Sequence, residues 1–198
     1  QGLVDAEASC RALAERVGCR QEEVLPFSTG VIGEPLPLYR VVTGLPAALA
    51  ALRPDGWSEA AHGIMTTDTR PKWASRRLNL NGRDVTVTGI AKGAGMICPD
   101  MATLLAFVAT DAAVDEAVLR SALTGAVAES FNAITVDGDT STNDSCLLLA
   151  TGQSGAKVSA EGEDYLRFAD TVRAVCNDLA QAIIRDGEGA TKFMTVRV

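Results

Sequence analysis

The chain has 198 residues, of which 47% are hydrophobic and 22% are charged, enough apolar material for one substantial globular domain. Its formal net charge is −7. A nucleic-acid-binding surface needs clustered basic residues to neutralise phosphates, so the acidic balance argues against that class and we expect no nucleic-acid partner. No apolar run approaches the roughly 18 residues that a membrane helix needs, so we expect no membrane association.

The cysteine and histidine content argues against a zinc site. The five cysteines are scattered without a Cys-x-x-Cys pair, and His62 is the only histidine. We therefore expect no bound metal, and we expect reduced thiols in a cytoplasmic protein.

The N-terminal third of the chain is predicted to be mainly helical. Apolar residues at helical spacing predict an amphipathic helix over residues 3–17, ended by Gly18. A short strand followed by a loop rich in glycine and proline is expected over residues 22–37. Residues 36–52 indicate one or two short helices, and a further helix is expected over Trp57–Met65.

The remainder of the chain alternates between strand and helix patterns. Two alternating runs flank Asn81-Gly82, a dipeptide typical of the type I′ turn, and predict a hairpin over residues 73–93. Further along we expect buried strands over 103–110 and 146–152, helices over 114–130 and 163–185, and a final strand over 191–198. This mixture predicts an α+β fold in which helices cover the sheets.

Two polar clusters and one glycine-rich loop stand out between these elements. Residues 134–144 carry three aspartates, Asp137, Asp139 and Asp144, but lack the glycine and closing glutamate of a calcium-binding EF-hand loop. We interpret the cluster as a turn whose side chains cap backbone groups, with a role in shaping a site as the alternative. Residues 63–72, GIMTTDTRPK, are either a similar capping turn or part of a site. The loop over Lys92–Ile97 lacks the helix that would bind phosphate.

Thr103 is the candidate nucleophile. In GMICPDMATLLAFVATDA, residues 95–112, it lies between a turn and an apolar strand. Threonine needs a base, and a lone helical histidine such as His62 is more often a surface or packed residue than a catalytic one. If the chain cuts itself after Ala102, the freed α-amine of Thr103 becomes that base. The residues alone leave this mechanism open against an ordinary strand threonine.

Six stretches in order along nearly the whole chain resemble one known family. They read QGLVDAE, STGVIGEPLP, GIMTTDTRPK, AKGAGMICPDMATLLAFVATDA, FNAITVDGDTSTNDS and DGEGATKFMTVRV. These motifs resemble the bifunctional ornithine acetyltransferase (glutamate N-acetyltransferase) family of arginine biosynthesis. The resemblance implies a layered α-β-β-α sandwich that cleaves itself between Ala102 and Thr103. It also implies transfer of acetyl from N-acetylornithine to glutamate through an acetyl-threonine ester.

Motif matching carries the family's functional residues onto this sequence. Thr29 and Gly30 resemble the family's oxyanion-hole pair. Four residues resemble its substrate-binding set: Thr66, Lys92, Thr103 and Glu188. We expect the lysine to meet a substrate carboxylate and the glutamate an amino group of ornithine. The chain departs from the family at Asp100, where the usual residue is Asn or another small polar one, and a carboxylate there is expected to alter the rate of self-cleavage.

The resemblance also implies how the protein is assembled. We expect one partial domain, with residues 1–102 in an α chain and residues 103–198 in a β chain, the two associating as a heterotetramer. No cofactor is expected, and acetyl-CoA would serve as a co-substrate only in a bifunctional member. The chain begins and ends within regular patterns, so we expect it to be an internal fragment of a longer enzyme.

Two other functions remain open at this point. An aminopeptidase or amidase of similar fold would use the same nucleophile and pass the acyl group to water. A non-enzymatic paralogue would only bind amino acids or a partner protein. The set Thr66, Lys92 and Glu188, suited to a charged amino acid, favours the transferase over the hydrolase, and the intact nucleophile motif argues against a degenerate paralogue.

Overall fold

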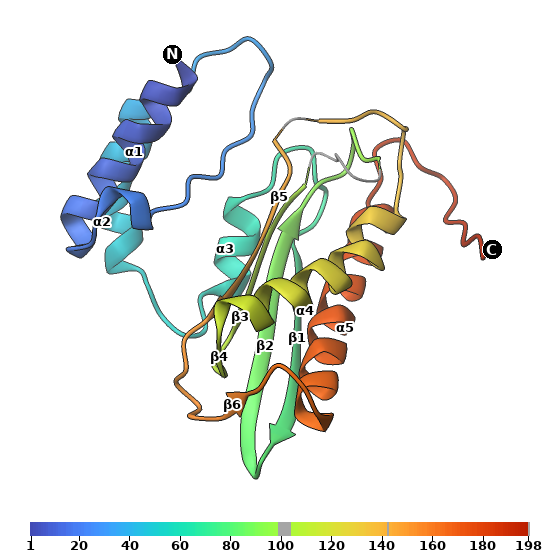
Figure 1. The fold of residues 1–198 in the computed structure, drawn as a ribbon. Coiled ribbons are helices and arrows are strands. Elements are labelled where there is room, and N and C mark those ends of the chain that lie inside the picture. The colour runs from blue at the N-terminus through green and yellow to red at the C-terminus, as the bar shows by residue number, and fades with distance from the viewer. Residues whose placement is uncertain (99–103, 142, 198) are drawn as a thin grey trace. The chain divides into compact units, whose positions relative to one another are not determined.

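The computed structural model describes residues 1–98, 104–141 and 143–197. Contacts divide the chain into two compact units, Gln1–Gly56 and Trp57–Val198 (Figure 1). The cleavage point expected at Ala102-Thr103 lies outside the described residues. A single domain over 1–198, with its α-chain and β-chain parts, stays a prediction.

The first unit is built from two helices. Helix α1 (Gly2–Val17) ends at Gly18, whose left-handed backbone lets its N–H bond the Ala14 carbonyl. It packs against α2 (Leu38–Ala50). The short strand expected after Glu22 is wrong. Residues Gln21–Glu23 form a 3-10 turn (η1) instead, because the Glu23 carboxylate accepts a hydrogen bond from the backbone N–H of Arg20.

The second unit is organised around a four-stranded sheet in the order β1-β2-β3-β5. Strands β1 (Lys72–Leu80) and β2 (Arg83–Lys92) form the predicted hairpin, in which Asn81 and Gly82 both have positive φ, as a type I′ turn requires. Strand β3 (Leu105–Thr110) runs antiparallel to β2 and parallel to β5 (Ser145–Ala150).

Helices α4 (Glu116–Ala128) and α5 (Glu163–Arg185) cover this sheet, as Figure 1 shows. Five fully buried residues of α5 recur every three or four positions, which confirms the predicted amphipathic helix: Phe168, Val172, Val175, Leu179 and Ile183. The helix approaches β2 closely at Gly89, where an added Cβ would lie 3.1 Å from Leu179 Cδ1. A shorter helix, α3 (Trp57–Gly63), contacts β1 and β2.

The sequence patterns did not predict the shortest elements. Two parallel two-residue strands, β4 (Ala113–Val114) and β6 (Lys157–Val158), form a second small sheet, and a 3-10 turn, η2, spans Phe131–Ala133. Strand β5 was expected to be buried, but it is an edge strand and Leu149 is 49% exposed.

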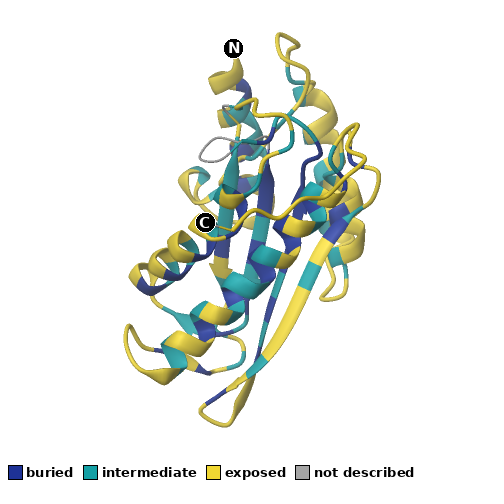
Figure 2. Cartoon of the chain, turned by 90° about the vertical axis from the view of Figure 1, so that its right-hand side faces the viewer, coloured by how far each residue is buried: buried dark blue, intermediate teal, exposed yellow. Residues whose placement is uncertain are grey.

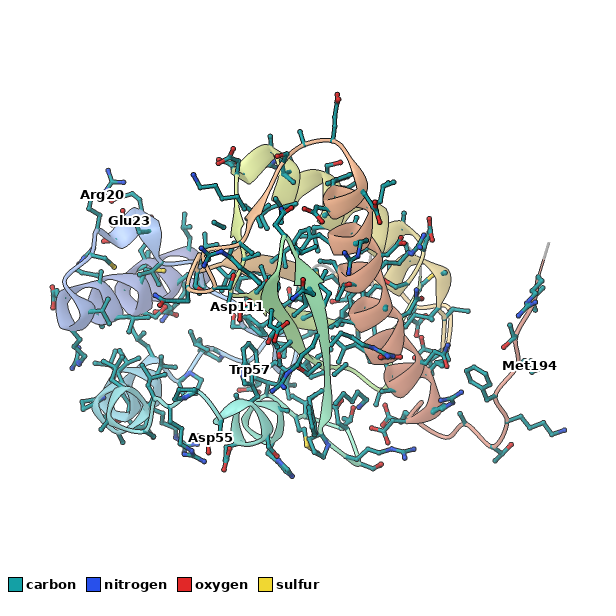
Figure 3. The ribbon with its side chains drawn as sticks, turned by 90° about the horizontal axis from the view of Figure 1, so that it is seen from below. Arg20, Glu23, Asp55, Trp57, Asp111 and Met194 are labelled. Carbon is teal, nitrogen blue, oxygen red and sulfur yellow. The ribbon has the colours of Figure 1, made fainter. Side chains whose placement is uncertain are left out.

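The final strand expected over residues 191–198 is wrong for the described residues 191–197, which are irregular and exposed (Figure 2). Met194, labelled in Figure 3, is 80% exposed. An alternating sequence becomes a strand only where a neighbour completes the ladder, and no strand in the described part of the chain pairs with this segment.

The α+β class is confirmed by these helices and the mixed sheet. The described residues hold one four-stranded and one two-stranded sheet, so the finer four-layer sandwich stays a prediction. Among them, no helix is both long and apolar enough to span a membrane.

Leu179→Ala tests the packing of α5 on the sheet. Because Leu179 is 0% exposed, we expect the free energy of unfolding to fall by ~2–5 kcal/mol in urea denaturation. Leu166 on the same helix is 61% exposed, so Leu166→Ala should change stability by less than about 0.5 kcal/mol. Equal losses for the two variants would contradict this packing.

Candidate functional site

A buried lysine lies between two carboxylates at one end of the main sheet. Lys72 Nζ is 2.5 Å from Asp68 Oδ1 and 2.6 Å from Asp186 Oδ2, and all three side chains are at most 2% exposed. Since an unpaired charge is costly to bury, each group requires the others. These three residues are hereafter the Asp–Lys–Asp network.

Asp68 also binds two backbone segments. Its Oδ2 accepts a hydrogen bond from Thr66 N at 3.1 Å, and its Oδ1 accepts one from Gly93 N at 2.8 Å. Burial opposes ionisation of Asp68, but these donors and the Lys72 ammonium outweigh it and hold the pKa of the carboxyl below its ordinary value. Asp68 therefore ties the loop that carries Thr66 to the end of β2. For GIMTTDTRPK, both the capping interpretation and the site interpretation are consistent with this geometry.

Asp186 anchors the same loop to the end of α5. It accepts hydrogen bonds from the backbone N–H of Thr69 at 3.0 Å and from the Thr69 hydroxyl. Burial opposes its ionisation, but Lys72 and Thr69 outweigh burial and lower the pKa of Asp186. The first residues after helix α5 are thereby held against the loop.

Lys92 is the last residue of β2 and is 2% exposed. Within the described ranges its Nζ forms no hydrogen bond or ion pair, unlike that of Lys72. Burial lowers the pKa of Lys92, while the negative charges of Asp68 and Asp144 limit the shift. A buried ammonium group without a protein partner in this part of the chain is suited to receive an anionic group of a ligand.

Asp144 lies beside Lys92, just before β5. Its Oδ1 accepts a hydrogen bond from Leu104 N at 2.7 Å, and its Oδ2 is buried with no hydrogen-bond partner among the residues described. Burial raises the pKa of Asp144 to about 6, although the Leu104 N–H and Lys92 oppose the rise. In the sheet, Leu105 pairs with Lys92 on one side and with Ser145 on the other. The two perturbed charges therefore flank the first described residues of β3.

Glu188 reaches this end of the sheet from α5. Its backbone N–H donates to the Ala94 carbonyl at 2.6 Å, and its Oε2 lies 2.6 Å from the position that a Cβ on Gly95 would occupy. Only a glycine at position 95 leaves room for the Glu188 carboxylate in this place.

Asp137 holds the next part of the same loop. Its carboxylate accepts hydrogen bonds from the backbone N–H groups of Met96, Ile97 and Asp139, at 2.6, 3.1 and 3.1 Å. Burial opposes ionisation, but these donors outweigh it and lower the pKa of Asp137. The capping interpretation of the 134–144 cluster is confirmed at Asp137, while Asp144 fits the alternative of shaping a site.

The structure therefore brings together three of the site residues expected from the sequence. The segments that carry Thr66, Lys92 and Glu188 are joined by direct hydrogen bonds, with Lys92 buried and the other two exposed. His62 is exposed and its Nδ1 bonds the Ser58 carbonyl of its own helix, as expected for a surface histidine.

The structure does not place the other expected residues relative to this site. Thr29 and Gly30 lie in the first unit, in an irregular segment, and their oxyanion-hole role stays a prediction. Ala102, Thr103 and Asp100 lie outside the described residues. Sequence reasoning missed Asp68, Lys72 and Asp186, although all three lie in or beside the motifs quoted above.

Comparisons with known proteins agree on one family. The ArgJ family matches over residues 1–198. The chain is 58% identical over 199 residues to the arginine biosynthesis bifunctional protein ArgJ of Methylococcus capsulatus, covering 100% of this chain and 49% of that relative. The chain thus spans about half the length of this curated relative.

Two solved structures are also similar. An arginine biosynthesis bifunctional protein argJ from Bacillus halodurans has 47% sequence identity and a TM-score of 0.42, over 43% of this chain and 41% of that one. An L-aminopeptidase D-Ala-esterase/amidase from Ochrobactrum anthropi has 12% identity and a TM-score of 0.32, over 61% of this chain and 42% of that one.

Asp144→Asn tests the buried carboxyl at the start of β5. A folded-state pKa of about 6 lies above the unfolded value of roughly 3.9, so the carboxyl favours folding at low pH and this contribution is lost as the pH rises from about 4 to about 6. Asparagine keeps the acceptor for Leu104 N–H but does not ionise. In thermal melts, we expect the stability of the variant minus that of wild type to be larger at about pH 7.5 than at about pH 4.5.

The exposed Asp139 provides the matched control, because Asp139→Asn on the surface should change stability by less than about 0.5 kcal/mol. A difference for Asp144→Asn that is constant with pH would contradict the raised pKa.

Proposed function

Because this chain belongs to the ArgJ family, we propose that the full-length protein transfers the acetyl group of N-acetylornithine to glutamate in arginine biosynthesis. The nucleophile is the hydroxyl of Thr103, freed as an N-terminal residue when the chain cleaves itself after Ala102. The two resulting chains remain associated as a heterotetramer in the cytoplasm, and no cofactor takes part. Acetyl-CoA is a second acetyl donor if the protein is bifunctional, as the relative from Methylococcus capsulatus is named.

The reaction proceeds in two half-reactions. The α-amine of Thr103 takes the hydroxyl proton while the oxygen attacks the acetyl carbonyl, and the C–N bond to ornithine breaks as the leaving amine gains a proton. The resulting ester is then attacked by the amino group of glutamate, which releases Thr103 and N-acetylglutamate. Thr29 and Gly30 donate hydrogen bonds to the oxyanion, an effect worth roughly 3–4 kcal/mol per donor in comparable sites.

One observation carries the proposal: a buried ammonium group without a partner in the described chain lies at the end of the sheet where β3 begins. Lys92 has the charge to bind the α-carboxylate that N-acetylornithine and glutamate share. Glu188, on the neighbouring loop, has the charge to bind the free side-chain ammonium of N-acetylornithine. The two charges together select a substrate that carries both an anion and a cation.

The alternative is an aminopeptidase or amidase that uses the same nucleophile with water as acceptor. It would not need this pair of opposite charges. The two reactions differ in the fate of the acetyl group, which appears as N-acetylglutamate in one case and as free acetate in the other.

The first test is the intact mass of the full-length protein. We expect two chains, the second beginning at Thr103, because the hydroxyl attacks the Ala102 carbonyl and water releases the ester. Thr103→Ala should give one uncut chain without acetyl transfer, whereas Thr124→Ala, in the exposed part of α4, should be cut like wild type. An uncut wild-type chain, or acetyl transfer by Thr103→Ala, would overturn the mechanism.

Gly95→Ala tests the role of Glu188 without removing its charge. The added Cβ would lie 2.6 Å from Glu188 Oε2, and the end of this exposed side chain moves at little cost. We expect kcat/KM for N-acetylornithine to fall by about 10-fold, or about 1.4 kcal/mol, in the direction also expected for Glu188→Gln. Gly125→Ala, with nothing within 4 Å of its added Cβ, is the control. Unchanged kinetics in Gly95→Ala and Glu188→Gln would remove Glu188 from the site.

A further inference from the structure

The Asp–Lys–Asp network has no part in the proposed reaction, yet it is the most deeply buried group of charges among the described residues. Its three side chains are at most 2% exposed. A buried ion pair is often no more stabilising than apolar residues of the same size. Its presence is better explained by what its geometry holds in place than by stability alone.

Asp68 controls the backbone at two proposed substrate-binding positions. One of its oxygens binds the N–H of Thr66 itself, at 3.1 Å, and the other binds the N–H of Gly93, at 2.8 Å. Gly93 directly follows Lys92. A shift of this one carboxylate would therefore move the Thr66 loop and the end of β2 together.

Asp186 controls the third position, that of Glu188. It lies two residues before Glu188, directly after α5, and it is held by Thr69 and by Lys72 Nζ at 2.6 Å. The N–H of Glu188 donates to Ala94. The segment 186–188 is thus fixed at both ends, once to the network and once to the loop after Lys92.

We infer that Asp68 and Asp186 are positioning residues: bridged by Lys72, they set the spacing of Thr66, Lys92 and Glu188 and thereby control substrate binding. The roles of these three substrate-binding residues rest on the proposed function. Strand β3, which follows the nucleophile position, is paired with β2 and β5, and Leu104 is held by Asp144. The network therefore acts on KM for N-acetylornithine more than on kcat.

The charge of Asp68 contributes as well as its hydrogen bonds. Burial lowers the pKa of Lys92, and two carboxylates oppose this shift, of which Asp68 has the larger effect. Removing the charge of Asp68 therefore lowers the pKa of Lys92 further and disfavours its charged form, in addition to loosening Thr66.

The experiment is a double-mutant cycle in the full-length protein with Asp68→Asn and Thr66→Ala. We expect Asp68→Asn alone to raise KM for N-acetylornithine by about 10-fold with kcat within about threefold, and its effect to be at least about threefold smaller when Thr66 is already alanine. Self-cleavage, followed by intact mass, should be unchanged. Additive effects on KM, a loss confined to kcat, or an uncut chain would overturn the inference.

The control is Asp178→Asn, which breaks an ion pair of the same length on the surface: Arg76 Nη2 lies 2.6 Å from Asp178 Oδ2, and both side chains are at least 45% exposed. We expect it to leave KM unchanged. If Asp68→Asn does not accumulate as folded protein, Thr69→Val removes only one hydroxyl from Asp186 and is expected to raise KM by about threefold. An unchanged KM in Thr69→Val would then count against the network.

Hydrogen exchange separates this inference from the proposed function. If wild-type protein makes no N-acetylglutamate, the proposed function is wrong. Amide exchange still decides whether the network has the positioning role. Segments containing Thr66 and Gly93 should exchange faster in Asp68→Asn, or in Thr69→Val if that variant replaces it, but not in Asp178→Asn. Exchange that is the same in all variants would show that the network does not hold these segments.

Discussion

The ion network of Lys72 with Asp68 and Asp186 is the constraint on which the arrangement of this site depends. It links the first residue of β1, the loop before it and the first residue after α5. Removing one partner of a buried ion pair typically costs roughly 3–5 kcal/mol, because an uncompensated charge remains. The network therefore prevents the ends of these elements from separating. It also fixes the positions of the loops attached to those ends.

The paired network contrasts with the charges beside it. Lys72 is satisfied by two carboxylates, whereas Lys92 and Asp144 interact electrostatically without a hydrogen bond between them. Burial shifts both toward the neutral form, lowering the pKa of the lysine and raising that of the aspartic acid. A ligand carboxylate at Lys92 would supply a hydrogen-bonding partner, so the charge that attracts an anion is in place before the anion binds.

Local patterns predicted the elements whose causes are local. The period of α5, the Asn81-Gly82 turn and the hydrogen bond from Asp139 N–H to the Asp137 carboxylate each depend on neighbouring residues, and each could be predicted from the sequence. The tail over 191–197 and the exposure of β5 could not, because a strand depends on what pairs beside it. The sequence patterns did not predict the Asp–Lys–Asp network for the same reason, since Lys72 and Asp186 lie far apart in the chain and neither is unusual by itself.

The site motifs gain a physical explanation from this arrangement. GIMTTDTRPK holds Thr66 together with Asp68 and Lys72, AKGAGM holds Lys92 together with Gly93, and Glu188 follows Asp186 in the last motif. Each motif thus combines a residue proposed to meet the substrate with a neighbour that fixes its backbone. Because the anchors are joined to one another, a change in one motif is transmitted to the other two through a network that the substrate need never touch.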